Sequence, residues 1–432
     1  MSSEAPTLLM LGGANPNVAS MCISQARARG LKIWVTDTEE NLKHAPALVK
    51  EVDRVTALPY NDPDACVAWS IEQAKTTSFV GVFGSREFAV EAVAAVAESL
   101  GLPGNPLRAV RLVRNKQACR EALRRLGFPQ PAVALCSTLE EARTFISEHP
   151  TGSWIIKPPA ATGSTGVCQI HSGDDLEEAL VYLKESCNAL DQNLKGRGVI
   201  EESVAYSAHA PFLIECFQEG EEYSAEGVFV YNQPHVLAVT SKVTLGAPHF
   251  VEVGHAMPAE LAPDILQVVK ETVESALLAL DLSWGQFHVE FWLDGKQVVL
   301  GELHVRAGGD QLHFMTQYVT GIELYGVLFD QMLGRTVDIA QYQPSRGVAI
   351  RFLTFPPGHV TSISGWEAVT TNASCLKAEL NLKVGDHVGS VYSSLDRRGF
   401  IVASGETTTE AIQNAERLVT TVQVGMEEVL IG

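Results

Sequence analysis

The feature that most constrains the fold is a strand pattern that ends in a lysine and runs directly into a loop of small residues. In the segment IIKPPAATGSTGV (155–167), Lys157 closes the apolar run, and Gly163 and Gly166 follow it. An ammonium group at the end of a strand, next to a loop thin enough for its N–H groups to approach a ligand, suits nucleotide phosphates. The lysine precedes the glycines, so the segment is not a GxxxxGK[ST] loop. By itself the segment is equally compatible with a plain hairpin that carries an exposed lysine.

The first hundred residues alternate strand and helix patterns. Strands are expected at 7–11, 32–36 and 78–83, and helices at 18–29 and 88–100. Such an alternation predicts a parallel sheet with helices on both faces. The Gly12–Gly13 turn after the first strand lacks the GxGxxG pattern, so we favour a structural role for it over cofactor binding.

A second block begins after the turn-rich segment LPGNP (102–106), which is a candidate domain boundary. One helix is expected over 109–126, with Lys116 near its start. Further strands are expected at 154–156, 212–216, 223–231, 287–293, 297–300 and within GVAIRFLTF (347–355), and further helices at 175–185, 262–280 and 408–422. The 432 residues therefore predict two or three domains.

Composition excludes several classes of function. Apolar residues make up 46% and charged residues 19%, a mix that supports well-filled cores, and the net charge of −19 speaks against a nucleic-acid partner. An acidic protein can still bind ATP, because a phosphate site needs only a few local cations and N–H groups. The eight cysteines show no CxxC pair, and no apolar run reaches about 18 residues. With no signal-peptide pattern at the N-terminus, we expect a cytoplasmic protein that does not contact a membrane.

Two carboxylates lie on neighbouring strand patterns that the turn Asp294–Gly295 joins. Glu302 and His304 share one face of the second strand because strand residues alternate, and Glu290 can face the same way from the first. Carboxylates held close together repel unless a cation lies between them, and Mg²⁺ prefers such oxygen ligands. Arg306, two residues further on that face, is placed to bind a phosphoryl oxygen. The alternative is a solvated strand face with alternating charges.

The order of these motifs resembles the ATP-grasp superfamily over roughly residues 100–330. Its members show a lysine before a helix that ends in a G-x-P-x-P pattern, here Lys116 and GFPQP (127–131), and then a strand lysine with a glycine loop. An acidic segment follows, here ECFQEGEEYS (215–224), and then a strand glutamate paired with an E-x-N-x-R motif. The resemblance implies an α/β ATP-grasp fold. Its expected parts are a Rossmann-like N-terminal domain (1–110), an ATP-grasp domain (111–335) with a small lid subdomain (about 130–210), and a C-terminal α+β domain (336–432).

Within this superfamily the chain is most similar to the L-amino-acid ligases and related carboxylate–amine ligases. The segments FVEVGHAMP (250–258) and RAGGD (306–310), and a C-terminal region of about a hundred residues, carry that similarity. It implies that ATP and Mg²⁺ drive amide formation between a small-molecule carboxylate and an amine, both amino acids, through an acyl phosphate. It also implies a homodimer. Two alternatives stay open: another ATP-grasp reaction, such as carboxylation through carboxyphosphate or a purine-pathway ligation, and an ATP-binding protein that regulates without turnover.

The resemblance assigns roles by position. The ATP-binding residues are Lys116, Lys157, the loop residues Gly163, Ser164, Thr165 and Gly166, the adenine-facing residues Glu215, Cys216 and Phe217, and Glu222 for the ribose. Glu290 and Glu302 would bind magnesium, and Arg306 and Lys157 would act in catalysis. Glu252, His255, Arg306, Gly308 and Gly309 would bind the substrates, although Glu252 and His255 could instead be an ordinary hydrogen-bonded surface pair.

His304 departs from the family pattern, which has asparagine at this position. An imidazole is a poorer Mg²⁺ ligand than an amide oxygen and suits Mn²⁺ or Zn²⁺ better. Either His304 still contacts a metal, which would make Mn²⁺ possible, or it has left the metal for a substrate or structural role. We favour the second reading.

Overall fold

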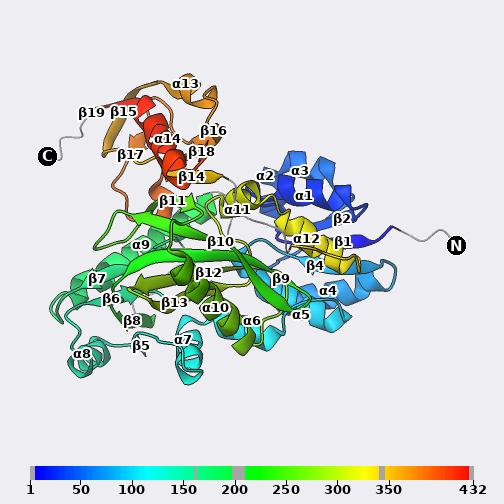
Figure 1. The fold of residues 1–432 in the computed structure, drawn as a ribbon, viewed down its shortest axis with the longest axis horizontal. Coiled ribbons are helices and arrows are strands. Elements are labelled where there is room, and N and C mark those ends of the chain that lie inside the picture. The colour runs from blue at the N-terminus through cyan, green and yellow to red at the C-terminus, as the bar shows by residue number, and fades with distance from the viewer. Residues whose placement is uncertain (1–4, 160–162, 197–209, 340–345, 428–432) are drawn as a thin grey trace.

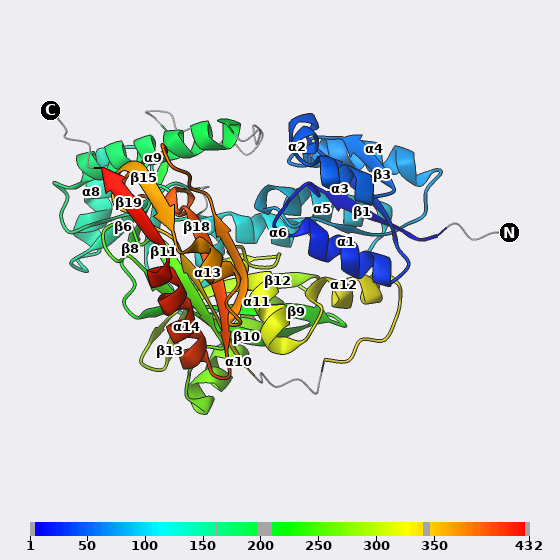
Figure 2. The same cartoon turned by 90° about the horizontal axis from the view of Figure 1, so that it is seen from above.

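The computed structural model describes residues 5–159, 163–196, 210–339 and 346–427 (Figures 1 and 2). Residues 160–162 of the glycine segment and 197–209 of the expected lid subdomain lie outside the described residues.

The N-terminal part is a four-stranded parallel sheet in the order β3-β2-β1-β4. Its strands are β1 (Thr7–Leu11), β2 (Lys32–Asp37), β3 (Arg54–Ala57) and β4 (Phe79–Phe83). The helices around it are α1 (Ala19–Ala28), α2 (Glu39–His44), α3 (Pro46–Glu51), α4 (Pro63–Ala74) and α5 (Val90–Leu100), with a short 3-10 turn at Glu87–Ala89. The β-α-β alternation of the sequence therefore produced the parallel sheet that it predicts.

One of the helices that pack on this sheet comes from much later in the chain. Helix α12 (Leu324–Met332) lies beside α1, and its Tyr325, Leu328 and Phe329 share one buried cluster with Leu8 and Ile33 (Figures 1 and 2). The N-terminal sheet thus buries one face against a helix that belongs, by sequence position, to the next domain.

The prediction of one helix over 109–126 is wrong in one respect, because the chain forms two helices there. They are α6 (Leu107–Arg114) and α7 (Lys116–Arg125). Asn115, with an extended backbone (φ −88°, ψ 102°), ends the first helix, and its side chain accepts a hydrogen bond from Ala118 N–H at 3.0 Å to cap the second. Lys116 therefore occupies the first residue of α7, where its side chain can turn toward the large sheet.

A small antiparallel sheet, called the lid sheet below, has the order β5-β8-β6-β7 and lies largely within the residues expected to form a lid subdomain. Its strands are β5 (Val133–Cys136), β6 (Trp154–Lys157), β7 (Cys168–Ile170) and β8 (Phe212–Cys216), with helices α8 (Leu139–Glu148) and α9 (Leu176–Gly196). Lys157 ends the inner strand β6 and is buried, which excludes the plain hairpin with an exposed lysine.

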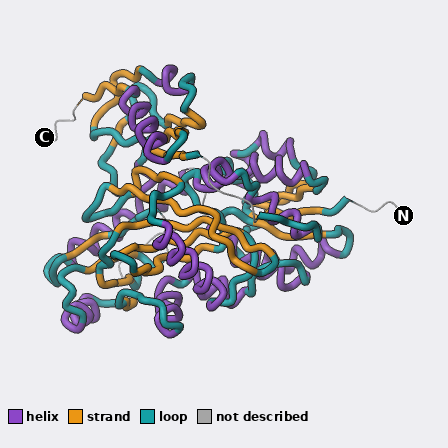
Figure 3. The backbone as a smooth tube through the Cα atoms, in the orientation of Figure 1, coloured by secondary structure: helices purple, strands orange, loops and turns teal. Residues whose placement is uncertain are grey.

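An eight-stranded antiparallel sheet forms the centre of the molecule, in the order β13-β12-β9-β10-β11-β14-β18-β16 (Figure 3). Five strands precede residue 336: β9 (Glu221–Val230), β10 (Gln233–Thr244), β11 (Glu252–Met257), β12 (Gln286–Asp294) and β13 (Gln297–His304). The other three are β14 (Gly347–Phe352), β16 (Cys375–Leu380) and β18 (Gly399–Gly405). Part of the C-terminal region therefore extends the sheet that β9 to β13 form.

The remaining elements cover or extend this sheet. Helices α10 (Pro263–Ala279), α11 (Leu312–Thr320) and α14 (Thr408–Thr421) pack on it, and α13 (Trp366–Thr370) lies against α14. A three-stranded sheet of β17 (His387–Val388), β15 (Gly358–Ser364) and β19 (Gln423–Glu427) lies at the outer end, and a 3-10 turn at Ser394–Asp396 precedes β18. Among the described helices, none combines the length and the apolar run that a bilayer span requires.

Gly227 lies where two strands and a large ring meet in the core. On β9 it is paired with Phe287 of β12, and a Cβ atom would lie 2.1 Å from the Phe287 ring and 2.4 Å from the carbonyl oxygen of His235. We expect Gly227→Ala to lower the free energy of unfolding by about 1–3 kcal/mol, because neither the ring nor the strand can move away without strain. The thermal unfolding midpoint measures this. The matched control is Gly389→Ala, whose Cβ would meet no atom within 4 Å, and equal midpoints for the two variants would contradict the packing argument.

Candidate functional site

A cavity of about 890 Å³ lies between the lid sheet and the large sheet. It is lined by most of the residues that the sequence singled out: Lys116, Lys157, Gly163, Ser164, Thr165, Glu215, Cys216, Phe217, Glu222, Glu252, His255, Glu290, Glu302, His304, Arg306 and Gly309. Of the expected site residues, only Gly166 and Gly308 are absent from this described lining, and Gly308 lines an adjoining cavity of about 400 Å³.

The end of the cavity near the lid carries three cations. Lys157 Nζ lies 2.9 Å from Glu215 Oε2, and Arg120 Nε donates to Glu215 Oε1 at 2.7 Å. Burial by itself would raise the pKa of Glu215, but Arg120 and Lys157 outweigh it and lower that pKa to about 2. Lys116 Nζ lies 2.5 Å from Glu302 Oε1. This end is therefore rich in fixed donors that suit an anionic triphosphate.

The glycine loop is closed against the C-terminal part of the chain. Gly163 and Ser164 have left-handed backbones (φ +65° and +58°), which is the conformation that favours glycine at such a bend. Ser164 Oγ donates to the carbonyl of Phe250 at 3.2 Å, and Ser394 N–H donates to the carbonyl of Gly163 at 3.0 Å. A second domain therefore holds the loop over the cavity.

Apolar rings line the cavity beyond the strand end of β8. Phe217 and Phe250 stack with their centroids 5.8 Å apart, and Cys216 lies beside them in the lining. Such a surface suits a flat base. The carboxylate of Glu215 faces Lys157 and Arg120 instead, so its side chain is not free to contact adenine.

The expected carboxylate hairpin is present. Strands β12 and β13 pair antiparallel, with His288 opposite His304 and a local irregularity between Val289 and Phe291, so Glu290 faces the region of Glu302. Leu303, between Glu302 and His304, is buried on the other face. The alternation that the sequence predicted therefore brings both carboxylates to the cavity.

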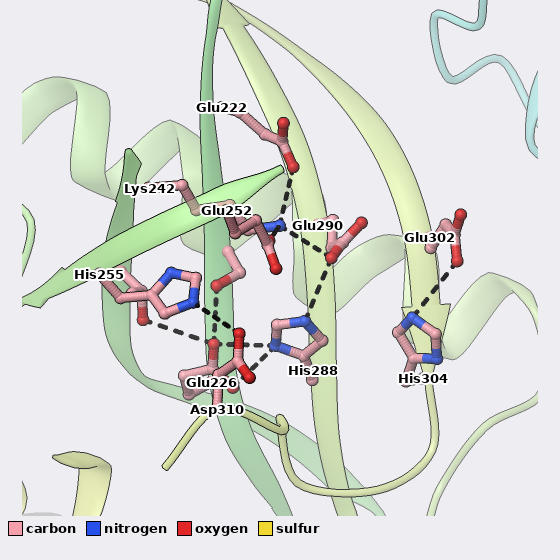
Figure 4. A network of polar contacts seen from close by, with 12 residues as sticks. Glu222, Glu226, Lys242, Glu252, His255, His288, Glu290, Glu302, His304 and Asp310 are labelled. Carbon is pink, nitrogen blue, oxygen red and sulfur yellow. Dashed lines mark hydrogen bonds and ion pairs between the residues drawn. The ribbon is translucent and has the colours of Figure 1, made fainter. Parts of the chain in front are cut away.

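Lys242 lies at the centre of three carboxylates (Figure 4). Its Nζ is 2.7 Å from Glu222 Oε1, 2.9 Å from Glu252 Oε1 and 2.8 Å from Glu290 Oε1. The side chain is 1% exposed, and although burial lowers the pKa of Lys242, the three carboxylates raise it well above its ordinary value. Lys242 is therefore a permanent cation, and it shows that this position favours positive charge.

His304 is turned toward the N-terminal domain. Its Nδ1 lies 3.0 Å from Glu87 Oε2, which also accepts from Arg306 Nε at 2.6 Å, and its Nε2 lies 3.6 Å from Glu302 Oε2. Burial would raise the pKa of Glu87, but His304 and Arg306 lower it well below its usual range. This geometry favours a role for His304 in orienting Arg306 and Glu302 over a role as a metal ligand.

The far end of the cavity is built around Asp310. His255 Nε2 lies 3.2 Å from Asp310 Oδ2, and Arg397 binds both oxygens of Asp310 at 2.8 and 2.7 Å. Glu252 has a carboxylate oxygen within 4.8 Å of the His255 and Asp310 ligand atoms. Of the substrate-binding residues that the resemblance assigns, Glu252 and His255 therefore lie at Asp310, whereas Arg306 pairs with Glu87.

Several residues that shape the site were not predicted from the sequence to belong to it. They are Glu87, Arg120, Glu226, Lys242, His288, Asp310 and Arg397. Strand alternation could have found two of them, because Glu226 shares a face with Glu222, and His288 shares one with Glu290. No local signal marks Glu87 or Arg397, since they reach the cavity only through the contacts between domains.

Comparisons with known proteins agree with the fold. Three family models match in order: an ATP-grasp N-terminal domain over residues 23–104, an ATP-grasp domain over 151–313 and the L-amino acid ligase C-terminal domain 2 over 351–427.

Individual relatives are distant. An uncharacterized protein of Sinorhizobium fredii is 23% identical over 82% of this chain and 70% of its own length. Mouse carnosine synthase 1 is 26% identical over 74% of this chain, and the match spans 38% of that protein's length. The crystal structure of an L-amino acid ligase from Bacillus licheniformis superposes with a TM-score of 0.78 at 20% identity, covering 99% of this chain and all of that one.

The chain therefore belongs to the ATP-grasp superfamily, the class that its three-part fold and its lysine-and-carboxylate cavity define. Its C-terminal part matches the L-amino acid ligase C-terminal domain model, and the family matches together define an ATP-dependent ligase that forms carbon–nitrogen bonds.

The buried His288, next to the carboxylates, should make the stability of the fold depend on pH. Burial lowers the pKa of His288, but Glu226, whose Oε1 lies 2.9 Å from Nδ1, outweighs it, and the pKa is raised from 6.5 to about 9. A raised pKa means that the charged pair stabilises the fold fully below pH 6.5 and loses that contribution as the pH rises through about 9.

We expect the thermal unfolding midpoint of the unmodified protein, free of divalent ions, to fall between pH 6.5 and 9 more steeply than that of His288→Gln. His359→Gln, at an exposed position on β15, is the control and should keep the original slope. Parallel pH curves for His288→Gln and the unmodified protein would show that the pair does not titrate in this range.

Proposed function

We propose that this chain uses ATP to join the carboxylate of one amino acid to the amine of another, releasing ADP and phosphate. The observation that carries this proposal is the set of charged groups that line the cavity between the lid sheet and the large sheet. Lysines that could bind phosphate pair with Glu302 and Glu215, and the Glu252, His255 and Asp310 cluster forms another part of the lining. The C-terminal match to an L-amino acid ligase domain supports amino acids as substrates.

In the first step a substrate carboxylate oxygen bonds to the γ-phosphorus of ATP as the bond to the β,γ-bridging oxygen breaks, which gives an acyl phosphate and releases ADP. Lys116 and Lys157 line the cavity and can neutralise phosphate oxygens, and Arg306, which also lines it, can bind the transferred phosphoryl group. Fixed cations in a water-poor site stabilise developing charge more effectively than they would in water. The closed glycine loop would exclude water and so protect the acyl phosphate from hydrolysis.

Two oxygen-bearing side chains suit a magnesium ion. Glu290 and Glu302 reach the cavity from adjacent strands, and lysines lie within 2.8 Å of each, which shows that cations are favoured at both. Mg²⁺ usually takes one or two protein carboxylates and completes its shell with phosphate oxygens and water. When bound there, Mg²⁺ would offset the charge of the triphosphate. With His304 turned to Glu87, the remaining donors are oxygens, which favours Mg²⁺ over Mn²⁺.

In the second step the amine of the other substrate attacks the acyl carbon, and phosphate leaves. The Glu252 carboxylate lies at the rim of the Lys242 cluster, where it can bind an ammonium group, and His255 can accept the proton that the amine must lose. The carbon–nitrogen bond forms as the bond from the acyl carbon to the phosphate oxygen breaks. No covalent bond to the protein is needed.

A phosphate-release assay with ATP, Mg²⁺ and mixtures of amino acids tests the proposal. Release that requires two amino acids, together with a product whose mass equals their sum less one water, supports it. Release that requires bicarbonate instead would assign carboxylation through carboxyphosphate. Binding of ATP without release under any of these conditions would assign a regulatory protein. The homodimer is also a proposal, and the mass measured by light scattering tests it.

Substitution of Glu302 tests the metal assignment most directly. We expect Glu302→Gln to lower turnover by at least about a hundredfold, because the amide has the shape of the carboxylate without the charge that holds magnesium. Its thermal midpoint should stay close to that of the unmodified protein.

Glu271→Gln is the matched control, since Glu271 lies on the exposed face of α10 and contacts only Gln267 among the described partners. If Glu302→Gln turned over as fast as this control, the metal assignment would be wrong.

A further inference from the structure

Asp310 joins three parts of the site through its two oxygens. The Arg397 guanidinium binds it in a bidentate pair, with Nη1 to Oδ2 at 2.8 Å and Nη2 to Oδ1 at 2.7 Å. His255 Nε2 lies 3.2 Å from the same Oδ2. Burial would raise the pKa of Asp310, but Arg397 and His255 lower it far below its usual range, so it is an ionised carboxylate that can only accept hydrogen bonds.

Arg397 is itself fixed by the C-terminal domain. Its Nε donates to the carbonyl of Ser394 at 2.8 Å, its Nη1 also donates to the carbonyl of Glu252 at 3.2 Å, and its guanidinium lies 3.6 Å above the Phe352 ring. Protein groups therefore engage Nε and both terminal nitrogens, and the side chain is 11% exposed. Such an arginine orients neighbouring groups more readily than it binds a substrate.

The ionised Asp310 determines which ring nitrogen of His255 carries the hydrogen. Because Asp310 can only accept, the Nε2 atom of His255 carries the hydrogen, and a neutral ring then has its lone pair on Nδ1. This side chain is 1% exposed, and within the described chain Nδ1 has no hydrogen-bond partner. Figure 4 shows the second ring nitrogen on the side away from Asp310. A protonated ring would bury an N–H with no acceptor, so the geometry favours the neutral form.

We propose that Arg397 is a positioning residue for amide formation: it neutralises Asp310, so that Asp310 orients His255 without stabilising the protonated imidazolium and leaves Nδ1 free to receive the proton of the attacking amine. This inference rests on the proposed function. In the step concerned, the amine nitrogen bonds to the acyl carbon, its proton passes to His255 Nδ1, and the phosphate leaves with the electron pair of the broken carbon–oxygen bond.

The charges around His255 explain why Arg397 matters. Asp310 lies against Nε2, Glu252 has an oxygen within 4.8 Å of the His255 and Asp310 ligand atoms, and Lys242 is paired directly opposite on β10. Lys242 is already shared among three carboxylates. Arg397 is the one arginine or lysine that pairs with Asp310 among the described residues, so without it a proton on His255 would supply the compensating charge.

Arg397→Met is the first test. We expect kcat to fall by about a hundredfold, the loss typical of a general base that no longer works, with KM for ATP unchanged. The low-pH limb of the kcat profile should move up by about one pH unit or more, because His255 would then hold its proton more tightly. Arg397→Lys retains the charge without the bidentate geometry and should recover part of the activity.

Arg351→Met is the matched control for loss of a partly buried arginine. Arg351 is 12% exposed against 11% for Arg397, but it pairs with Glu416 on the far side of β14 and lines neither cavity. Its kcat and pH profile should match those of the unmodified protein. Equal losses in the two arginine variants would mean that Arg397 only supports the fold, and the proposal would fail.

The double variant Arg397→Met with Asp310→Asn separates positioning from direct substrate binding. An asparagine carbonyl can still accept from His255 Nε2 but carries no charge to be compensated, so the double variant should turn over faster than Arg397→Met alone. A double variant no faster than the single one, with a raised KM for an amino acid, would assign Arg397 to the substrate and overturn the proposal.

Nitrogen NMR of the histidine rings tests the inference without any turnover. The protein is labelled with ¹⁵N-histidine, and the His255 signals are those that disappear in His255→Gln. In the unmodified protein at about pH 7.5, these signals should be those of a neutral His255 ring with its hydrogen on Nε2. Arg397→Met should show an imidazolium at the same pH. If amino acids support no phosphate release but this shift occurs, the proposed function fails while the positioning role stands. An unchanged ring in Arg397→Met would refute the positioning role.

Discussion

The rest of the structure depends on the way four strands share the charge of Lys242. This lysine projects from β10, and its three carboxylate partners come from β9, β11 and β12, so a single ammonium ties together the middle of the large sheet. Removing so many charges from water is costly, and it is tolerated only when each charge has close partners of opposite sign. The cluster therefore fixes the register of the strands at the point where the reaction is proposed to occur.

Pairing of buried carboxylates with cations continues around the Lys242 cluster. Lys116 pairs with Glu302, Lys157 and Arg120 pair with Glu215, and Arg397 pairs with Asp310, so these carboxylates of the cavity also meet fixed cations. The part near the lid has three cations for two carboxylates, whereas Lys242 is shared among three carboxylates. A nucleotide and two amino acids bring both signs of charge, and such a surface can exchange its internal pairs for pairs with the substrates.

The division into three domains is less complete than the chain order suggests. Helix α12 closes the core of the N-terminal sheet, and β14, β18 and β16 continue the central sheet beyond residue 336. The turn at Ser394–Asp396 contacts the glycine loop and precedes Arg397, so one short segment touches both ends of the site. The C-terminal part is thus a wall of the cavity as well as an addition to the sheet.

Sequence by itself determined the parts of this protein that local periodicity and short motifs encode. The parallel N-terminal sheet, the buried strand before Lys157, and the hairpin that carries Glu290 and Glu302 all follow from alternation and turn residues, because these depend on neighbours a few positions apart. The break at Asn115 was missed, since the apolar spacing continues across it while the capping side chain interrupts the backbone. Tertiary structure alone decided which charges meet. Glu87 is 217 residues from His304, and Arg397 is 87 residues from Asp310, and pairs at such separations are set by how sheets and domains pack, which no local pattern records.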